Sequence, residues 1–201
     1  MRNRRLYALG LLLLVSACSA PSTKKQVQTD KTLVCDIDAA DKCSKADMSL
    51  YETLPDEGHV FLEMNFAKAN EVLKDKSFTG ILYFGFANCP WCLDAIPIMN
   101  EAAKENEQSI YYIDTKAQSA IDNPKWREET TKLLNASFPL KKNDEGKPHL
   151  FVPLVVVIKN GDVTSYHLGT LDDHDANKRE MSDDEENELK RIYKDMFDDI
   201  K

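Results

Sequence analysis

The sequence predicts an α/β fold with a central mixed sheet and helices on both faces. Short apolar segments typical of strands alternate with segments of helical periodicity along most of the chain. Two apolar segments near the C-terminal end are joined by Asn160-Gly161, a strong β-hairpin signal. The chain has 201 residues, 42% of them hydrophobic, which suits one domain with a substantial core.

The expected elements alternate first and then end in a hairpin and a helix. The expected strands are 59–66, 80–86, 109–114, 154–158 and 163–168. The expected helices are 65–76, 90–103, 123–138 and a terminal helix that ends near residue 200. Ser182 and Glu185 form a capping box at the start of that last helix. Alternation in the first half favours parallel strands, and the hairpin adds an antiparallel edge.

The first residues have the layout of a secretory signal. A basic start is followed by the apolar run 6–15, which is too short to span a bilayer permanently. The run ends in Val15-Ser16-Ala17-Cys18, which resembles the lipobox of bacterial lipoproteins. The resemblance implies cleavage of a signal peptide, 1–17, and lipidation of Cys18. An ordinary signal with a chance cysteine and an N-terminal anchor are the alternatives.

We therefore expect the mature protein to lie at the extracytoplasmic face of a bacterial membrane, held by its lipid. The formal net charge of −8 argues against nucleic acid as a partner. It also argues against adhesion to anionic lipid, so anchoring would depend on the acyl chains. Residues 18–32 are expected to be a flexible tether, 33–58 an N-terminal extension and 59–201 the folded domain.

The most informative stretch is Cys89-Pro90-Trp91-Cys92, between an expected buried strand and an expected helix. If the helix starts at Pro90, Cys89 lies at its N-terminus, where unpaired N–H groups and the helix dipole stabilise a thiolate. Cys92 would lie one turn further and be more buried. We therefore expect Cys89 to be the attacking thiol and Cys92 the resolving thiol.

Two motifs give the chain its resemblance to the thioredoxin fold, over about residues 59–200: the Cys-x-x-Cys and Val152-Pro153 before the next buried strand. The resemblance implies a cis peptide bond before Pro153, with the Val152 backbone beside Cys89, where it could bind a substrate segment by strand addition. Pro90 and Trp91 are also expected to contact the substrate, with a packed aromatic edge as the alternative for Trp91. The lipobox and the two motifs together resemble thioredoxin-like bacteriocin-transport accessory proteins.

The chain departs from the family pattern in three places. Thioredoxins usually have Trp directly before the first cysteine, where this chain has Asn88. They carry a buried acid six residues before that cysteine, where this chain has Tyr83, and the acid assists proton transfer from the resolving thiol. The stretch 115–148 is longer than compact thioredoxins need, which implies an enlarged helical insertion before the cis-proline.

The resemblance implies a thiol–disulfide oxidoreductase that needs no metal and no cofactor beyond its redox-active disulfide. Its partners would be extracytoplasmic protein substrates and a membrane redox partner. The alternative is a non-catalytic accessory or binding module for a secretion or transport system. The direction of electron flow stays open, since Cys-Pro resembles periplasmic oxidases whereas a lipid tether resembles reductases.

Other functions of the cysteines remain open. Cys89 and Cys92 could form a structural disulfide, a zinc site with Cys35 and Cys43, or a copper site near His149. Cys35 and Cys43 are expected to form a structural disulfide, with a second exchanging pair as the alternative. Three other histidines have no evident partner and are assigned to the surface, and Asp94 is interpreted as a solvated helix acid. These histidines are His59, His167 and His174.

Overall fold

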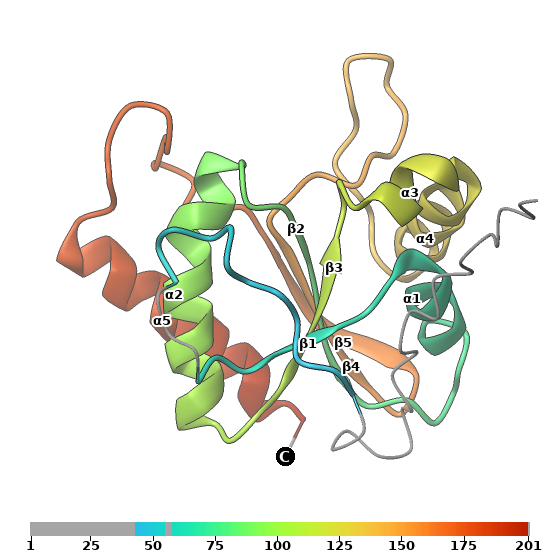
Figure 1. Cartoon of the computed structure of the whole chain (residues 1–201), viewed down its shortest axis with the longest axis horizontal. Helices are drawn as coiled ribbons and strands as arrows, with labels where there is room; N and C mark the ends of the chain where they lie inside the picture. The colour runs from blue at the N-terminus through green and yellow to red at the C-terminus, as the bar shows by residue number, and fades with distance from the viewer. Residues whose placement is uncertain (1–42, 55–57, 201) are drawn as a thin grey trace, which may run out of the picture. The chain divides into compact units, whose positions relative to one another are not determined.

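The structure is a computed structural model that describes residues 43–54 and 58–200 (Figure 1). The predictions for the signal peptide 1–17, the tether 18–32, Cys18 and Cys35 lie outside the described residues and stay predictions. The chain divides into two units, 1–31 and 32–201, and everything described below belongs to the second.

A five-stranded mixed sheet forms the centre of this unit. Its strands are β1 (Phe61–Glu63), β2 (Gly80–Gly85), β3 (Ile110–Asp114), β4 (Leu154–Lys159) and β5 (Asp162–Leu168), in the order β1-β3-β2-β4-β5. The strands β1, β3 and β2 are parallel, whereas β4 is antiparallel to both β2 and β5. This arrangement confirms the predicted parallel first half and the antiparallel hairpin at the edge.

Helices cover both faces of the sheet, as predicted (Figure 1). They are α1 (Phe66–Val72), α2 (Pro90–Glu105), α3 (Gln118–Asp122), α4 (Pro124–Ser137) and α5 (Asp183–Asp198). The helices α2 and α5 contact each other on one face, and α1 contacts α4 on the other. Across the described parts of the chain, no helix is long and apolar enough to cross a membrane.

Two hydrophobic clusters, one on each face of the sheet, form the core. Neighbouring residues of one strand enter different clusters because successive side chains of a strand point to opposite faces. In β2, Ile81 and Tyr83 pack under α2 and α5, whereas Leu82 and Phe84 pack under α1 and α4. Because both faces are covered, the central strands are continuous apolar runs rather than alternating ones.

The helix boundaries differ from the sequence prediction in two places. The helix α1 ends at Val72 rather than near residue 76, because the chain turns there. In this turn the Asp75 carboxylate accepts a hydrogen bond from the Ser77 backbone N–H. The five-residue helix α3 was not expected. Together α3 and α4 occupy the predicted insertion 115–148, and the capping box of Ser182 and Glu185 is present at the start of α5.

Residues 43–54, which the sequence assigned to an extension before the domain, contribute to the core. Ala46, Met48, Tyr51 and Leu54 are buried in the cluster under α2 and α5. The backbone of this segment also forms an isolated antiparallel bridge with β1, and Thr53 donates a hydrogen bond of 2.6 Å to the Leu93 carbonyl oxygen of α2. The segment is therefore packed directly against the helix that carries the two cysteines.

Cys43 is disulfide-bonded at the start of this segment. Its predicted partner, Cys35, lies outside the described residues, so this pairing stays a prediction. Cys89 and Cys92 are free thiols.

The hairpin glycine Gly161 allows a prediction of stability, and Gly146 provides the control. Gly161 and Gly146 both have positive φ, 76° and 73°. A Cβ at Gly161 would collide with the Lys76 backbone and lie 2.8 Å from the Asp75 carbonyl oxygen, whereas nothing lies within 4 Å at Gly146. We expect Gly146→Ala to cost about 1–2 kcal/mol, from the left-handed backbone alone. Gly161→Ala should cost about 1–2 kcal/mol more, because backbone has to move.

Urea unfolding of the two variants measures this difference. Equal losses of unfolding free energy at the two positions would contradict it, since both share the backbone conformation and only Gly161 is crowded.

Candidate dithiol site

The two thiols are placed by the junction of β2 and α2. The strand β2 is buried along almost its whole length. A short connection leads from its end to Cys89, which is the N-cap residue of α2. Pro90 occupies the first turn of the helix, where its missing N–H removes no helical hydrogen bond. Cys92 lies within the same first turn, as the motif spacing predicts, and both thiols are buried.

The environment of Cys89 favours its thiolate. A hydrogen bond from Cys92 lowers the pKa of Cys89, burial opposes this, and backbone N–H groups of Cys92 and Trp91 lower the pKa further, to about 7. These N–H groups belong to the first turn of α2, where a helix leaves donors unpaired. Cys89 is therefore ionised to a large extent at neutral pH, which is the state in which a thiol attacks a disulfide.

The environment of Cys92 favours its neutral thiol. Its hydrogen bond to Cys89 and its burial, in that order, raise the pKa of Cys92 far above that of an ordinary cysteine. Hydrogen bonds from the Phe86 backbone and the Tyr83 hydroxyl group oppose this and lower the pKa of Cys92. The resemblance already marked position 83 as the place of the acid that assists the resolving thiol, and the structure places the buried Tyr83 hydroxyl group against that thiol.

The Val152–Pro153 peptide bond is cis, as the resemblance implied. The Sγ atom of Cys89 lies 3.9 Å from the Val152 carbonyl oxygen, which brings the two motifs together across 63 residues. Pro153 is buried, whereas Val152, Pro90 and Trp91 are half-buried around the thiol. All of the residues predicted to contact substrate therefore lie at one place.

A hydrogen bond near the dithiol corrects two sequence assignments. His174 is buried rather than on the surface, and its Nε2 atom lies 2.7 Å from the Asp94 carboxylate, whose side chain is 23% exposed. The negative charge of Asp94 raises the pKa of Cys89 and partly opposes the effects that lower it. The two partners are 80 residues apart, in α2 and in the loop before α5, so no local sequence signal could have joined them.

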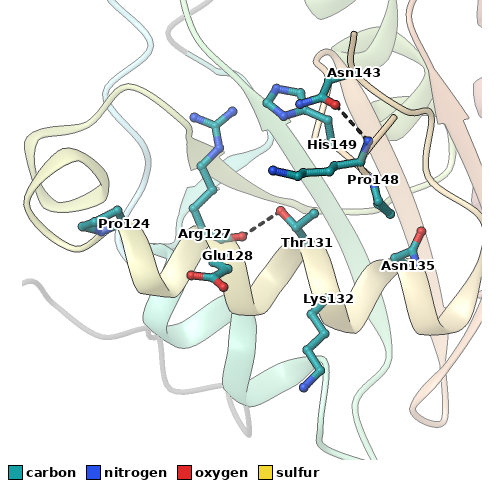
Figure 2. Close-up of a pocket in the computed structure, with 10 residues that line it drawn as sticks. Pro124, Arg127, Glu128, Thr131, Lys132, Asn135, Asn143, Pro148 and His149 are labelled. Carbon is teal, nitrogen blue, oxygen red and sulfur yellow. Dashed lines mark hydrogen bonds between the residues drawn. The ribbon is translucent and has the colours of Figure 1, made fainter. Parts of the chain in front are cut away.

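A separate pocket of about 520 Å³ lies between α4 and the loop that follows it. Figure 2 shows Arg127 and Thr131 of α4 on one side and Asn143 and His149 of the loop on the other. Cys43, Cys89 and Cys92 do not line this pocket. Over residues 43–54 and 58–200, no three His, Cys, Asp or Glu side chains are grouped so that they could hold a metal ion.

The strand order, the helices on both faces, the dithiol at the start of α2 and the cis-proline beside it define a thioredoxin-like α/β fold. No protein-family model matches the chain, and no curated protein matches it. Among solved structures, thioredoxin O2 from Arabidopsis thaliana in its oxidized state is 18% identical, with 69% of this chain and 96% of that chain covered and a TM-score of 0.42. Thioredoxin O1 from the same plant is also 18% identical. The match covers 68% of this chain and 97% of that chain, with a TM-score of 0.40.

The pKa of Cys89 gives a testable pH dependence. We expect alkylation of the reduced protein by iodoacetamide to occur at Cys89 and to follow a titration with a midpoint near pH 7, because only the thiolate reacts. Below the midpoint the rate should fall about tenfold for each pH unit. In Cys92→Ala the leading stabilising hydrogen bond is lost, so the midpoint should move up towards 9.0, the ordinary value. A midpoint that is the same in both proteins would show that Cys92 does not stabilise the thiolate.

Proposed function

We propose that the protein is a thiol–disulfide oxidoreductase that acts on protein thiols and disulfides through Cys89 and Cys92. The observation that supports this most strongly is the opposite tuning of two adjacent free thiols. The pKa of Cys89 is lowered to about 7, and that of Cys92 is raised. A pair with only a structural role would not need one thiol to be ionised and the other to be kept neutral.

In the reducing direction, the Cys89 thiolate attacks one sulfur of a substrate disulfide. A bond forms between Cys89 and that sulfur, and the other substrate sulfur leaves as a thiolate. Cys92 then loses its proton and attacks Cys89, so the Cys89–Cys92 disulfide forms and the first substrate sulfur leaves with the electron pair. The oxidising direction is the reverse sequence, and the same residues perform it.

The groups around Cys89 support binding of an extended substrate segment. The Val152 carbonyl oxygen faces the thiol at 3.9 Å and offers a backbone partner for strand addition, while Trp91 and Pro90 form half-buried apolar surface beside it. Backbone recognition of this kind fixes the position of a substrate cysteine without requiring one particular sequence around it.

The cellular setting belongs to the same proposal and is supported by the sequence alone. Cys18 is lipidated after removal of residues 1–17, and the domain works at the extracytoplasmic face of a bacterial membrane. The substrates are exported proteins, and a membrane redox partner restores the dithiol or the disulfide without any bound cofactor. The resemblance to thioredoxin-like bacteriocin-transport accessory proteins makes a transport or secretion system the natural setting for those substrates.

The equilibrium reduction potential of the pair tests this proposal. The protein is equilibrated in thiol–disulfide buffers, alkylated, and the Cys89–Cys92 peptide is identified by mass. A potential of about −120 to −180 mV indicates a disulfide donor, and one near about −270 mV indicates a reductase. A pair that exchanges only when the domain unfolds would reject the oxidoreductase and leave a non-catalytic accessory or binding module.

A further inference from the structure

The proposed function leaves the proton of Cys92 without an acceptor in its second step. In the reduced protein Cys92 forms a hydrogen bond with Cys89, whose thiolate could take that proton. In the mixed disulfide the Cys89 sulfur is bonded to the substrate and carries no charge. Cys92 is fully buried, so another group must receive its proton before it can attack.

The hydroxyl group of Tyr83 is in place to do this. Tyr83 is fully buried in β2, and a hydrogen bond with its hydroxyl group lowers the pKa of Cys92, so this contact favours loss of the Cys92 proton. The hydroxyl also lies against the backbone at Gly85, where an added Cβ would collide with it. The absence of a side chain at Gly85 therefore leaves room for the Tyr83 hydroxyl group.

Two further tyrosine hydroxyl groups continue from Tyr83. The hydroxyl oxygens of Tyr83 and Tyr51 are 3.4 Å apart, and Tyr51 donates a hydrogen bond of 3.2 Å to the hydroxyl group of Tyr112. The rings hold one another in place: Tyr83 stacks on Tyr112 at 5.5 Å between centroids, and Tyr51 meets Tyr112 edge-on at 5.8 Å. All three tyrosines are buried.

The chain of hydroxyl groups ends at a pocket. Tyr51 and Tyr112 both line a pocket of about 380 Å³, which is also lined by Asp114 and Lys116 at the end of β3 and by Asn88 next to Cys89. Water in this pocket, or the Asp114 carboxylate, can accept a proton from Tyr112. The hydrogen bond from Tyr51 to Tyr112 points in the direction that such a transfer requires.

We propose that Tyr83, Tyr51 and Tyr112 form a proton relay that deprotonates Cys92 when it attacks the mixed disulfide. The Cys92 proton passes to Tyr83, the Tyr83 proton to Tyr51, the Tyr51 proton to Tyr112, and the Tyr112 proton to water or Asp114 in the pocket. At the same time the Cys92–Cys89 bond forms, and the substrate sulfur leaves with the electrons of the broken bond. In the oxidising direction the protons return along the same path.

The protons have to move together in this relay. Burial raises the pKa of all three tyrosines, so none of them ionises by itself near neutral pH. Each hydroxyl group instead accepts one proton as it releases another, and the three oxygens remain neutral before and after the step. Tyr83 touches the reacting thiol and is a catalytic residue, while Tyr51 and Tyr112 act through it.

A two-step reaction with 5,5′-dithiobis(2-nitrobenzoate) separates the relay from the rest of the chemistry. Attack by Cys89 releases one coloured thiolate and leaves a mixed disulfide, and attack by Cys92 releases the second. In stopped-flow measurements on the reduced protein, we expect Tyr83→Phe to leave the first phase unchanged and to slow the second by about tenfold or more. The solvent deuterium isotope effect on the second phase should also fall.

Tyr111→Phe is the matched control. Tyr111 is buried in the same strand as Tyr112 but belongs to the core cluster on the opposite face. This variant also removes a buried tyrosine hydroxyl group. The rates of both phases should stay within about twofold of those of the original protein. Tyr51→Phe and Tyr112→Phe should slow only the second phase, by less than Tyr83→Phe, and they carry the test if Tyr83→Phe does not fold.

The outcomes separate the relay from the proposed function on which it rests. Biphasic release with an unchanged second phase in all three tyrosine variants would overturn the relay and leave the oxidoreductase intact. If Asp94→Asn slows the second phase and the tyrosine variants do not, the carboxylate paired with His174 is the acceptor and the relay is again overturned. Absence of any release from the unmodified reduced protein would instead reject the oxidoreductase itself.

Discussion

Replacing Cys89 by alanine should abolish thiol–disulfide exchange, whereas replacing Cys92 should stop it halfway. Cys89 is the only one of the two thiols whose surroundings favour the thiolate, and it faces the Val152 carbonyl oxygen at the proposed substrate position. Without it, the neutral and buried Cys92 has no route to a substrate. Without Cys92, the Cys89 thiolate still attacks, but the mixed disulfide has no internal thiol to resolve it.

A peptide disulfide with a fluorescent label allows both results to be measured. With Cys89→Ala we expect no detectable turnover and no labelled protein on a non-reducing gel. Cys92→Ala should give one labelled adduct per protein that disappears on reduction, with peptide mass locating the label at Cys89. An adduct on Cys92 in the Cys89→Ala protein would reverse the assigned roles.

Phe197→Ala should cost about 3–5 kcal/mol of unfolding free energy, a large part of the 5–15 kcal/mol typical of a domain. The side chain is fully buried, and its ring stacks on Tyr193 at 6.0 Å between centroids. It lies on the face of α5 that packs against the core under α2, so truncation leaves a cavity beside the helix that carries the dithiol. The loss is expected to be large because a close-packed core relaxes only partly around a cavity.

Urea unfolding compares this variant with Asp195→Ala, which is two residues away on the exposed side of the same helix. The control should change the unfolding free energy by less than about 0.5 kcal/mol. A loss below about 1 kcal/mol for Phe197→Ala would mean that α5 contributes little to the core and can separate from α2 at small cost.

The elements that the sequence predicted well are those whose burial leaves a local pattern. Strands β2 and β4 are buried on both faces and appear as continuous apolar runs, and α5 has one apolar stripe and a capping box. The helix α3 gave no such signal, because it has only five residues, one of them buried, and its N-cap Ala117 forms no side-chain cap. The packing of residues 43–54 was missed for a related reason: four apolar side chains without periodicity are buried by tertiary contacts alone.

The same distinction applies to the candidate site. The positions of Cys89, Cys92 and Val152-Pro153 followed from two short motifs and the strand–helix junction. The pair of Asp94 with His174 depends on side chains that the fold brings together from positions 80 residues apart. Position 83 was marked by the family pattern, but the contacts that join Tyr83 through Tyr51 to Tyr112 link distant parts of the chain, so only the structure shows them.

The placement of Tyr51 has a consequence for how this protein can change over evolution. Tyr51 comes from residues 43–54, ahead of the first strand, yet its hydroxyl lies next to that of Tyr83 behind the dithiol. The behaviour of the thiols is thus divided between the Cys-Pro-Trp-Cys motif and a segment whose sequence carries no motif. Substitutions in that segment can alter the rate of exchange while the motif stays the same, so two relatives with identical motifs need not have equal activities.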